Sequence, residues 1–182
     1  ETYAFHIDFE KKVSTKLDYI PSYSQSKINT KYSKEELTVR VDANGSFSPE
    51  AAIEKLTLLE SIDIHSIEQP IAAGQYKKMQ ELCSLSPLKI ALDEELIGVH
   101  SKEAMLSLLR EIRPAYIILK PSLLGGFLAC NDWIATAESL NIGWWMTSML
   151  ESNVGLNAIA QFASTCPNLM HQGLGTGQLY SN

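Results

Sequence analysis

Short apolar runs rich in β-branched and aromatic residues recur along the chain from residue 37 onward, and a more polar stretch follows each of them. Runs of this kind, bounded by turn residues, are typical of buried strands. We expect strands at 37–42, 64–68, 88–92, 115–119 and 142–147, with a weaker candidate near 169–172.

Between the expected strands, apolar positions return every three or four residues, which is the spacing of an amphipathic helix. The expected helices are 48–60, 74–83, 101–112, 125–140 and 152–163. The first has a clear beginning, because Ser48 is a preferred N-cap residue and Pro49 suits the first helical position. Strands that alternate with helices in this way indicate βαβ units and a parallel sheet.

A polar residue follows each apolar run at a regular interval. The intervals run from Asp42 to Glu68 (26 residues), to Asp93 (25), to Lys120 (27) and to Thr147 (27). One βα unit of a (β/α)8 barrel takes about 30 residues. An open doubly wound sheet has units of similar length, but only a barrel gathers successive strand ends around one mouth, where barrel enzymes carry their active sites. The spacing therefore predicts an α/β fold of the TIM-barrel type.

The first 36 residues carry a weaker pattern. Apolar residues at helical spacing between Phe9 and Ile20 predict one helix, and residues 21–36 are polar and turn-rich. We expect residues 1–36 to form a helix and a polar loop that lead into a barrel part spanning residues 37–182.

Composition excludes several classes of partner. The chain has 182 residues and a net charge of −6, without a cluster of Lys and Arg that could follow phosphates, so we expect no nucleic-acid partner. No apolar run is long enough to span a bilayer, so we expect no membrane partner. Cys83, Cys130 and Cys166 show no metal or disulfide spacing, which indicates free thiols and a cytoplasmic location.

The acidic residues at three strand ends predict a metal site. Asp42, Glu68 and Asp93 each follow an apolar strand, so their side chains are expected to meet at the barrel mouth. Three carboxylates so close together could not all stay ionised without compensation. A divalent cation with oxygen ligands removes the repulsion, and Mg²⁺ suits such a site, with Mn²⁺ as an alternative. The simpler interpretation is that each acid is a solvated residue at a strand end.

Lys120 holds the equivalent position on the next strand. A lysine there could transfer protons or stabilise a developing negative charge with its ammonium group. Taken alone, it could equally be a lysine that extends to solvent. Its position one repeat after three acids favours a catalytic role.

The motifs that carry these residues resemble those of the enolase superfamily, and within it those of the o-succinylbenzoate synthase family of menaquinone biosynthesis. The resemblance extends over about residues 37–180. The similar stretches are DAN at 42–44, IEQP at 67–70, LDEE at 92–95, ILKPSLLGG at 118–126, WWMTSMLESNVGLNAIAQ at 144–161 and QGLGTGQL at 172–179.

This resemblance implies a magnesium-dependent carbon–oxygen lyase. Asp42, Glu68 and Asp93 would bind Mg²⁺, and the metal would hold the carboxylate of a small-molecule substrate, 2-succinyl-6-hydroxy-2,4-cyclohexadiene-1-carboxylate. Abstraction of the proton next to that carboxylate would give an enediolate stabilised by the metal charge. The β-hydroxyl would then leave as water and the ring would become aromatic. Lys120 would lie on one face of the ring and stabilise the enediolate.

Further residues are assigned more simply. Asn44 and Ser148 are expected to contact the substrate. Glu94 alternates away from Asp93 and is expected to be structural. Glu151 is expected to help begin the helix near 152.

The sequence also departs from the family pattern. The family carries a Lys-x-Lys motif at the end of its second barrel strand, and the second lysine is the principal acid/base. Nothing here matches that motif, because Lys11 and Lys12 lie inside a helical pattern. We therefore expect an incomplete enolase-type barrel of about six βα units without the capping domain. Such a chain would bind metal weakly and turn over little substrate.

Two other functions remain open. An N-succinylamino acid racemase or another racemase or epimerase of the superfamily would use the same metal site and lysine without loss of water. A dipeptide epimerase would show Asp-x-Asp near the last strand, which the stretch QGLGTG at 172–177 lacks. The third possibility is a barrel fragment without catalytic activity. The sequence does not indicate an oligomeric state.

Overall fold

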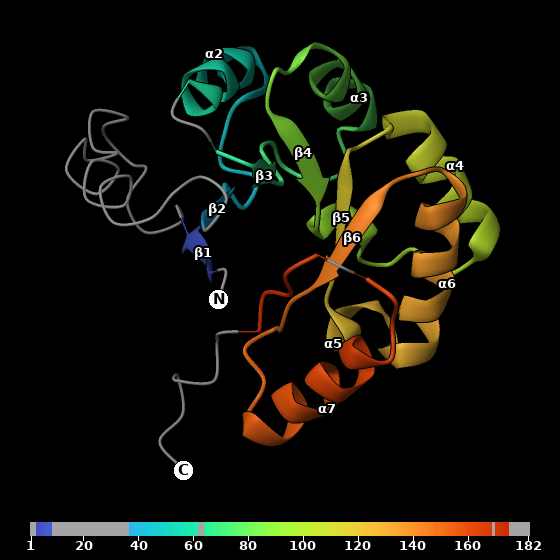
Figure 1. Ribbon diagram of the computed structural model, residues 1–182. Coiled ribbons are helices and arrows are strands. Elements are labelled where there is room, and N and C mark those ends of the chain that lie inside the picture. Colours follow the sequence, from blue (N-terminus) through green and yellow to red (C-terminus); the bar gives the residue numbers. More distant parts are fainter. Residues whose placement is uncertain (1–2, 9–36, 62–63, 169, 175–182) are drawn as a thin grey trace. The chain divides into compact units, whose positions relative to one another are not determined.

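The structure is a computed structural model, and the residues that it describes are 3–8, 37–61, 64–168 and 170–174 (Figure 1). The chain divides into two compact units, residues 1–90 and residues 91–182. Parallel strands that alternate with helices form both units. None of the helices in the described part of the chain is long and apolar enough to span a lipid bilayer.

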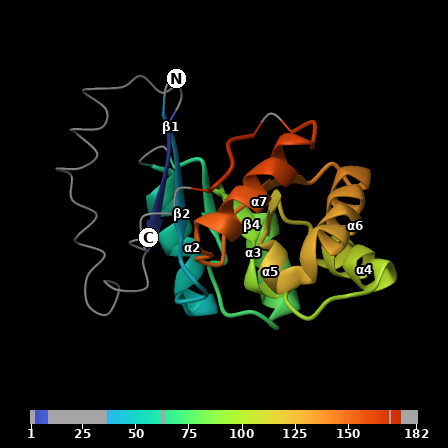
Figure 2. The same cartoon turned by 90° about the horizontal axis from the view of Figure 1, so that it is seen from below.

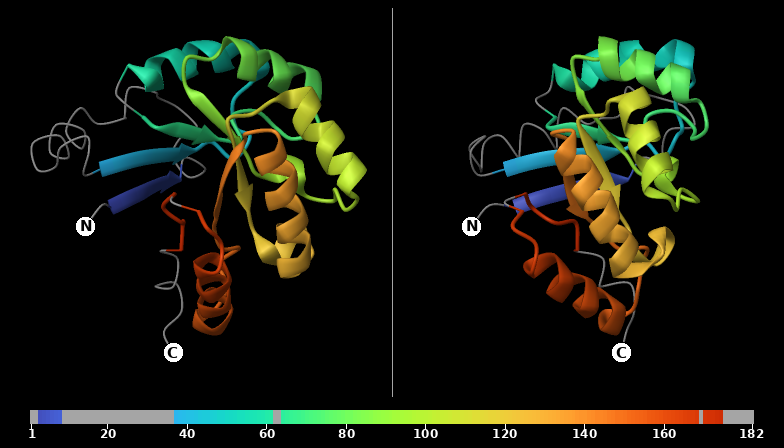
Figure 3. Two further views of the ribbon diagram at one scale, coloured as in Figure 1. Left: turned by 45° about the vertical axis from the view of Figure 1, so that its right-hand side comes forward. Right: turned by 90° about the vertical axis from the view of Figure 1, so that its right-hand side faces the viewer.

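The described residues of the first unit form three complete parallel strands and two helices, followed by the beginning of a further strand. Its elements are β1 (Tyr3–Asp8), β2 (Leu37–Asp42), α2 (Pro49–Glu60), β3 (Ser66–Glu68) and α3 (Tyr76–Leu85). Helices α2 and α3 lie side by side (Figures 1 and 3). Helix α2 begins as predicted, because Ser48 is its N-cap and accepts a hydrogen bond from the Ala51 N–H at 3.4 Å.

Strand β1 was not predicted from the sequence. It is parallel to β2, with Tyr3 opposite Leu37 and Asp8 opposite Asp42, and the two strands run side by side in Figure 3. The helix expected between Phe9 and Ile20 lies outside the described residues.

The two faces of β2 and β3 differ in character. Val41 and Ile67 are register partners, and both are buried. Because side chains alternate along a strand, the residues that flank Val41 on β2 and Ile67 on β3 face the opposite way. These flanking residues are polar, and Arg40 and Ser66 are register partners among them. An apolar face therefore fills the core of this unit, and a polar face is left for chemistry.

The second unit repeats the same alternation of strand and helix. Its elements are β4 (Lys89–Leu92), which begins in the first unit, η2 (Glu94–Leu96), α4 (Lys102–Ile112), β5 (Tyr116–Leu119), α5 (Pro121–Leu124), α6 (Gly126–Ser139), β6 (Gly143–Met146) and α7 (Asn153–Ser164). Strands β4, β5 and β6 are parallel. Helices α4 and α6 lie side by side (Figures 1 and 2), and α6 also contacts β5 and β6.

One face of these strands carries a buried apolar layer. Ala91, Ile118 and Trp145 form it, and Tyr116 and Met170 pack against it. The rings of Tyr116 and Trp145 lie 5.3 Å apart at an angle of 56°. This layer fixes the orientation of the strands whose next residues carry the candidate site.

The expected strands and helices from residue 37 to residue 164 are confirmed to within two residues at either end, while η2 and α5 were not predicted. The weaker strand near 169–172 is wrong. The described part of this segment contacts β6 through side-chain amides, because Asn168 Nδ2 donates to the Trp144 carbonyl at 2.6 Å and Gln172 Oε1 accepts from the Met146 N–H at 2.7 Å. Among the described residues of the segment, Gly173 forms an isolated backbone bridge with Thr147, directly after β6.

His65, directly before β3, makes the stability of the first unit depend on pH. Its N–H donates to the Val39 carbonyl at 2.8 Å, and its Nδ1 lies 2.9 Å from Ser66 Oγ. Burial, with the cations Arg40 and Lys89 nearby, lowers the pKa of His65 from 6.5 to about 4. The unfolded chain therefore takes up this proton near pH 6.5, whereas the folded chain does so only near pH 4.

We therefore expect the free energy of unfolding to fall as the pH is lowered from 6.5 to 4, and the contribution of His65 to level off below that window. His65→Gln should give a smaller fall over the same range, because glutamine does not titrate. Urea unfolding of both proteins at pH 7, 5.5 and 4.5 measures the difference. Equal pH dependence in the two proteins would show that His65 is not the responsible group.

Candidate active site

Asp42 and Glu68 are buried side by side at the ends of neighbouring strands. Asp42 ends β2, Glu68 ends β3, and the two are register partners. Their side chains lie on the polar face, opposite Val41 and Ile67, and the residues are only 5% and 4% exposed. Neighbouring strands are about 4.8 Å apart. Two carboxylates at such positions repel each other strongly unless a positive charge compensates them.

A buried cation lies on the same face. Arg40 is two residues before Asp42 on β2, opposite Ser66 on β3, and both residues are buried. Its charge is one of the causes that lower the pKa of His65. A guanidinium group here offsets part of the repulsion between the two carboxylates. The polar face of this unit therefore has two layers: the carboxylates of Asp42 and Glu68 form one, and the cation Arg40 lies in the next.

The loops after β2 and β3 hold Asp42 in place. The Asn44 N–H donates to Asp42 Oδ1 at 2.8 Å, and Asn44 has a left-handed backbone with φ 45°. The Gly45 N–H donates to the Gln69 carbonyl at 2.7 Å. A Cβ atom at Gly45 would lie 2.9 Å from the Ala72 Cα, and Gly45 also has φ +68°, so this close approach requires glycine.

The second unit contains an ion pair at the ends of β4 and β5. Lys120 Nζ donates to Asp93 Oδ2, and the two side chains are 18% and 4% exposed. Lys120 has an extended backbone and continues the alternation of β5, so its side chain shares a face with Ile118. Asp93 and Lys120 thus meet above the buried layer, as the strand-end prediction requires of these two residues.

Thr147 is a further candidate that the sequence analysis did not select. It continues β6 beyond Trp145 on the same face, and its N–H donates to the Leu119 carbonyl at 3.0 Å. Its Oγ1 is buried and has no hydrogen-bond partner among the described residues. A buried hydroxyl without a partner is unfavourable, so it is suited to contact a ligand. The available signal was its interval of 27 residues from Lys120.

The other predicted residues lie at the same strand ends. Ser148 is buried, and its Oγ accepts from the Leu150 N–H at 3.3 Å. Glu94 begins η2 and is half-buried, whereas its neighbour Glu95 is buried, which the sequence did not indicate.

The predicted set of three metal ligands is divided between the units. Asp42 and Glu68 belong to residues 1–90, and Asp93 belongs to residues 91–182. Across the described ranges, no group of three or more His, Cys, Asp and Glu side chains is arranged to hold a metal ion. The magnesium site and the roles assigned to its residues therefore stay predictions.

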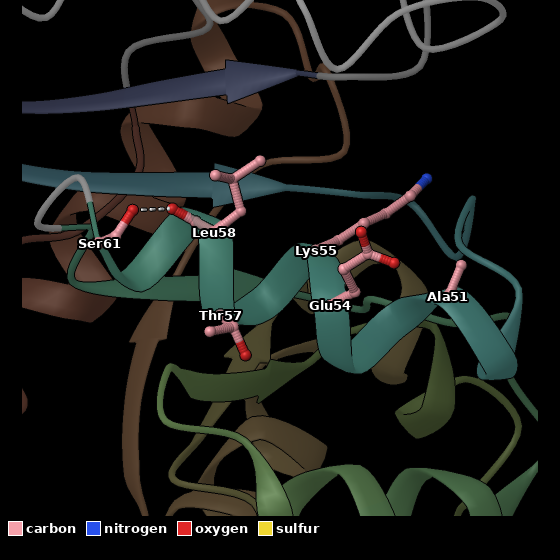
Figure 4. Close-up of a pocket in the computed structure, with 6 residues that line it drawn as sticks. All are labelled: Ala51, Glu54, Lys55, Thr57, Leu58 and Ser61. Atoms are coloured by element: carbon pink, nitrogen blue, oxygen red, sulfur yellow. Dashed lines mark hydrogen bonds between the residues drawn. The ribbon is translucent and has the colours of Figure 1, made fainter.

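The surface of α2 has a hollow that none of the candidate residues at the strand ends lines. It has a volume of about 490 Å³ and is lined by Ala51, Glu54, Lys55, Thr57, Leu58 and Ser61 (Figure 4). Every described residue that lines it comes from this one helix or its C-cap, and none lies at the carboxyl end of a strand. It offers no constellation for catalysis.

Known proteins are similar to this chain in sequence and in fold. The o-succinylbenzoate synthase of Desulfotalea psychrophila is 54% identical over 155 residues, which are 85% of this chain and 42% of that protein. A crystal structure of MenC from the same organism matches 98% of this chain and 48% of its own, with a TM-score of 0.85 and 47% identity. Muconate cycloisomerase from Pseudomonas fluorescens matches the same shares, with a TM-score of 0.82 and 26% identity.

The chain spans less than half the length of these relatives. Residues 27–180 match the family described as Enolase C-terminal domain-like. The chain therefore belongs to this family of the enolase superfamily, and its fold is part of the superfamily's (β/α)8 barrel, as the strand-end spacing predicts.

Proposed function

We propose that this chain supplies the carboxyl-terminal part of an o-succinylbenzoate synthase active site. The reaction is the dehydration of 2-succinyl-6-hydroxy-2,4-cyclohexadiene-1-carboxylate to o-succinylbenzoate, and we expect it to take place in the cytoplasm. The observation that carries the proposal is the buried series of polar residues at successive strand ends, Asp42, Glu68, Asp93 and Lys120. Identity of 54% with the Desulfotalea psychrophila synthase supports the choice of reaction.

Asp42, Glu68 and Asp93 would hold a divalent cation. The buried register pair Asp42 and Glu68 fits such a group, because two adjacent carboxylates need positive charge and offer only oxygen donors. Oxygen donors suit Mg²⁺ and also Mn²⁺. When bound, the cation would neutralise the carboxylate of the substrate and make the neighbouring carbon more acidic.

Lys120 would stabilise negative charge as the proton next to the substrate carboxylate is removed. Its ammonium group is held at the strand end by Asp93 and is largely shielded from water, which strengthens its interaction with a developing anion. The Asn44 side chain and the hydroxyl groups of Ser148 and Thr147 would contact the substrate, because they belong to the same strand ends. Asn44, Ser148 and Thr147 would thus bind and orient the substrate, whereas Lys120 would stabilise the negative charge that develops on it.

Two alternative functions remain. A racemase or epimerase of the superfamily would need Lys120 and the acids but no loss of water. A role without catalysis is favoured by β1, because this strand precedes β2 in space and its residues Tyr3–Asp8 include no lysine. The acid/base lysine that the resemblance implies on that neighbouring strand is therefore missing from the described β1.

We expect purified chain 1–182 to dehydrate the substrate at least about 10²-fold more slowly than the Desulfotalea psychrophila synthase, since a general acid/base contributes about 10²–10⁴-fold. Formation of o-succinylbenzoate in the presence of Mg²⁺ measures this difference. The expectation is wrong if the chain dehydrates the substrate at a rate comparable to that of the synthase and Lys120→Ala abolishes this activity. The chain would then need no lysine on β1.

A chimera restores the missing part and separates the three functions. In it, the upstream region of the Desulfotalea psychrophila synthase precedes residues 37–182 of this chain. We expect the chimera to dehydrate the substrate, and Lys120→Ala to lower kcat by about 10²–10⁴-fold. Lys102 is an exposed lysine on α4, and Lys102→Ala is the matched control, which should leave kcat unchanged. A folded chimera that only racemises N-succinylamino acids, or does neither reaction, would reject the proposal.

The Lys120–Asp93 pair should also stabilise the second unit. Lys120→Met should lower the free energy of unfolding by about 3 kcal/mol, because it leaves a buried carboxylate without its ammonium partner. The double variant Asp93→Asn/Lys120→Met should be more stable than the sum of the single changes predicts. Urea unfolding of chain 1–182 gives the coupling energy.

The exposed pair Lys102–Asp132 is the matched control for this cycle. Its atoms are 2.9 Å apart, but its side chains are 69% and 31% exposed, so its coupling should be at most about 1 kcal/mol. Equal coupling in the two pairs would mean that burial does not strengthen the Lys120–Asp93 interaction.

A further inference from the structure

The carboxylate of Glu151 connects two successive strand-to-helix loops. Glu151 Oε1 accepts a hydrogen bond from Ser122 Oγ at 2.5 Å, and Oε2 accepts from the Met149 N–H at 2.7 Å. Ser122 lies in α5, after β5, whereas Met149 lies in the loop after β6. We call these two hydrogen bonds the Glu151 bridge. The expectation that Glu151 merely helps to begin α7 does not explain why both of its oxygens bind elsewhere.

One end of the bridge is two residues from the catalytic lysine. Lys120 is the N-cap of α5, and its carbonyl accepts from the N–H groups of Leu123 and Leu124 at 2.9 and 3.1 Å. Pro121, between Lys120 and Ser122, has a fixed φ angle. This short turn is therefore stiff, and a contact that holds Ser122 also limits the movement of Lys120.

The other end holds the loop that carries Ser148. The backbone of Leu150 has φ 64°, a conformation that residues other than glycine rarely adopt. Ser148 Oγ accepts from the Leu150 N–H, and Glu151 accepts from the Met149 N–H between them. Two side chains thus support an unfavourable turn directly after β6.

Gly155 leaves the space that the Glu151 side chain occupies. A Cβ atom at Gly155 would lie 2.9 Å from Glu151 Cβ and 3.1 Å from its Cγ. Gly155 lies inside α7, where glycine is unfavourable relative to alanine. A larger residue at 155 would push against Glu151 at its backbone-fixed Cβ, so this glycine leaves room for the segment that carries Glu151.

We propose that Glu151 is a positioning residue: its carboxylate fixes the lysine-bearing turn after β5 against the serine-bearing loop after β6. Lys120 and Ser148 then keep a constant relative position as substrate binds. The inference rests on the proposed function, because it gives these two residues their roles at the substrate.

Four variants of chain 1–182 separate the contacts. Glu151→Ala removes both hydrogen bonds, and Ser122→Ala removes one. Glu151→Gln can keep both, since its amide oxygen accepts from Met149 and its NH₂ donates to Ser122 Oγ. Glu111→Ala, an exposed acid near the end of α4, is the control. The measurements are hydrogen exchange of the Met149 amide and the rate of reductive methylation of Lys120.

We expect Glu151→Ala to speed Met149 exchange about tenfold, as loss of a hydrogen bond to a charged group implies. Lys120 should be methylated several-fold faster in Glu151→Ala and in Ser122→Ala. Glu151→Gln and Glu111→Ala should stay within about twofold of the parent chain. The amides of β5 and β6 should not change, because the effect is confined to the loops.

Unchanged Met149 exchange or unchanged Lys120 methylation in Glu151→Ala would overturn the proposal. Exchange that rises equally throughout β5 and β6 would also overturn it, because Glu151 would then support the unit as a whole. Adding Mg²⁺ and o-succinylbenzoate to the chimera, which restores the missing part of the site, tests the proposed function separately. If they give Lys120 no protection from methylation, that function fails, whereas the result on the bridge still stands.

Discussion

The alternation of side chains along parallel strands is the constraint on which the candidate site depends. Val41 and Ile67 fix which face of β2 and β3 is apolar, and Asp42 and Glu68 must then lie on the other face. On β5 and β6 the buried Ile118 and Trp145 instead lie on the same face as Lys120 and Thr147, and their packing directs these two side chains. A shift in register by one residue would turn each candidate side chain to the opposite face and expose the core residues. The packing of the core and the orientation of the candidate site are therefore one requirement.

Burial makes this arrangement costly, and nearby charges reduce the cost in each unit. Asp42 and Glu68 share their face with the buried cation Arg40, whereas Asp93 is paired with Lys120. A carboxylate buried without such a partner would be protonated or would destabilise the fold. The proposed metal would add to this compensation, and it would compete with the ammonium group of Lys120 for Asp93. In the proposed function, Lys120 would therefore serve the fold before substrate binds and the chemistry afterwards.

The sequence predicts most of the fold because its strands after residue 37 are short apolar runs with polar ends, and its helices carry clear caps such as Ser48. Strand β1 was missed although Tyr3, Phe5 and Ile7 alternate along it with the period of a strand. Its pairing with residues 37–42 is a non-local interaction. The segment near 169–172 was mistaken for a strand because Asn168 and Gln172 bind β6 through their side chains. Within the site, regular spacing identified Asp93 and Lys120, which the structure brings together. The same spacing reaches Thr147, but it does not indicate that the Thr147 hydroxyl is buried, because burial depends on packing.

Loop contacts complete what the strands begin, and they do so within each unit. In the first, the Gly45 N–H and the Gln69 carbonyl join the loops that follow β2 and β3, directly after Asp42 and Glu68. In the second, the Glu151 bridge joins the loops that follow β5 and β6, directly after Lys120 and Thr147. Both contacts link neighbouring strand ends, and both use a glycine that allows close approach, Gly45 in one case and Gly155 in the other. Each unit therefore orders its own share of the strand-end residues by local contacts. This explains how a chain that spans less than half of its relatives can still hold those residues in position.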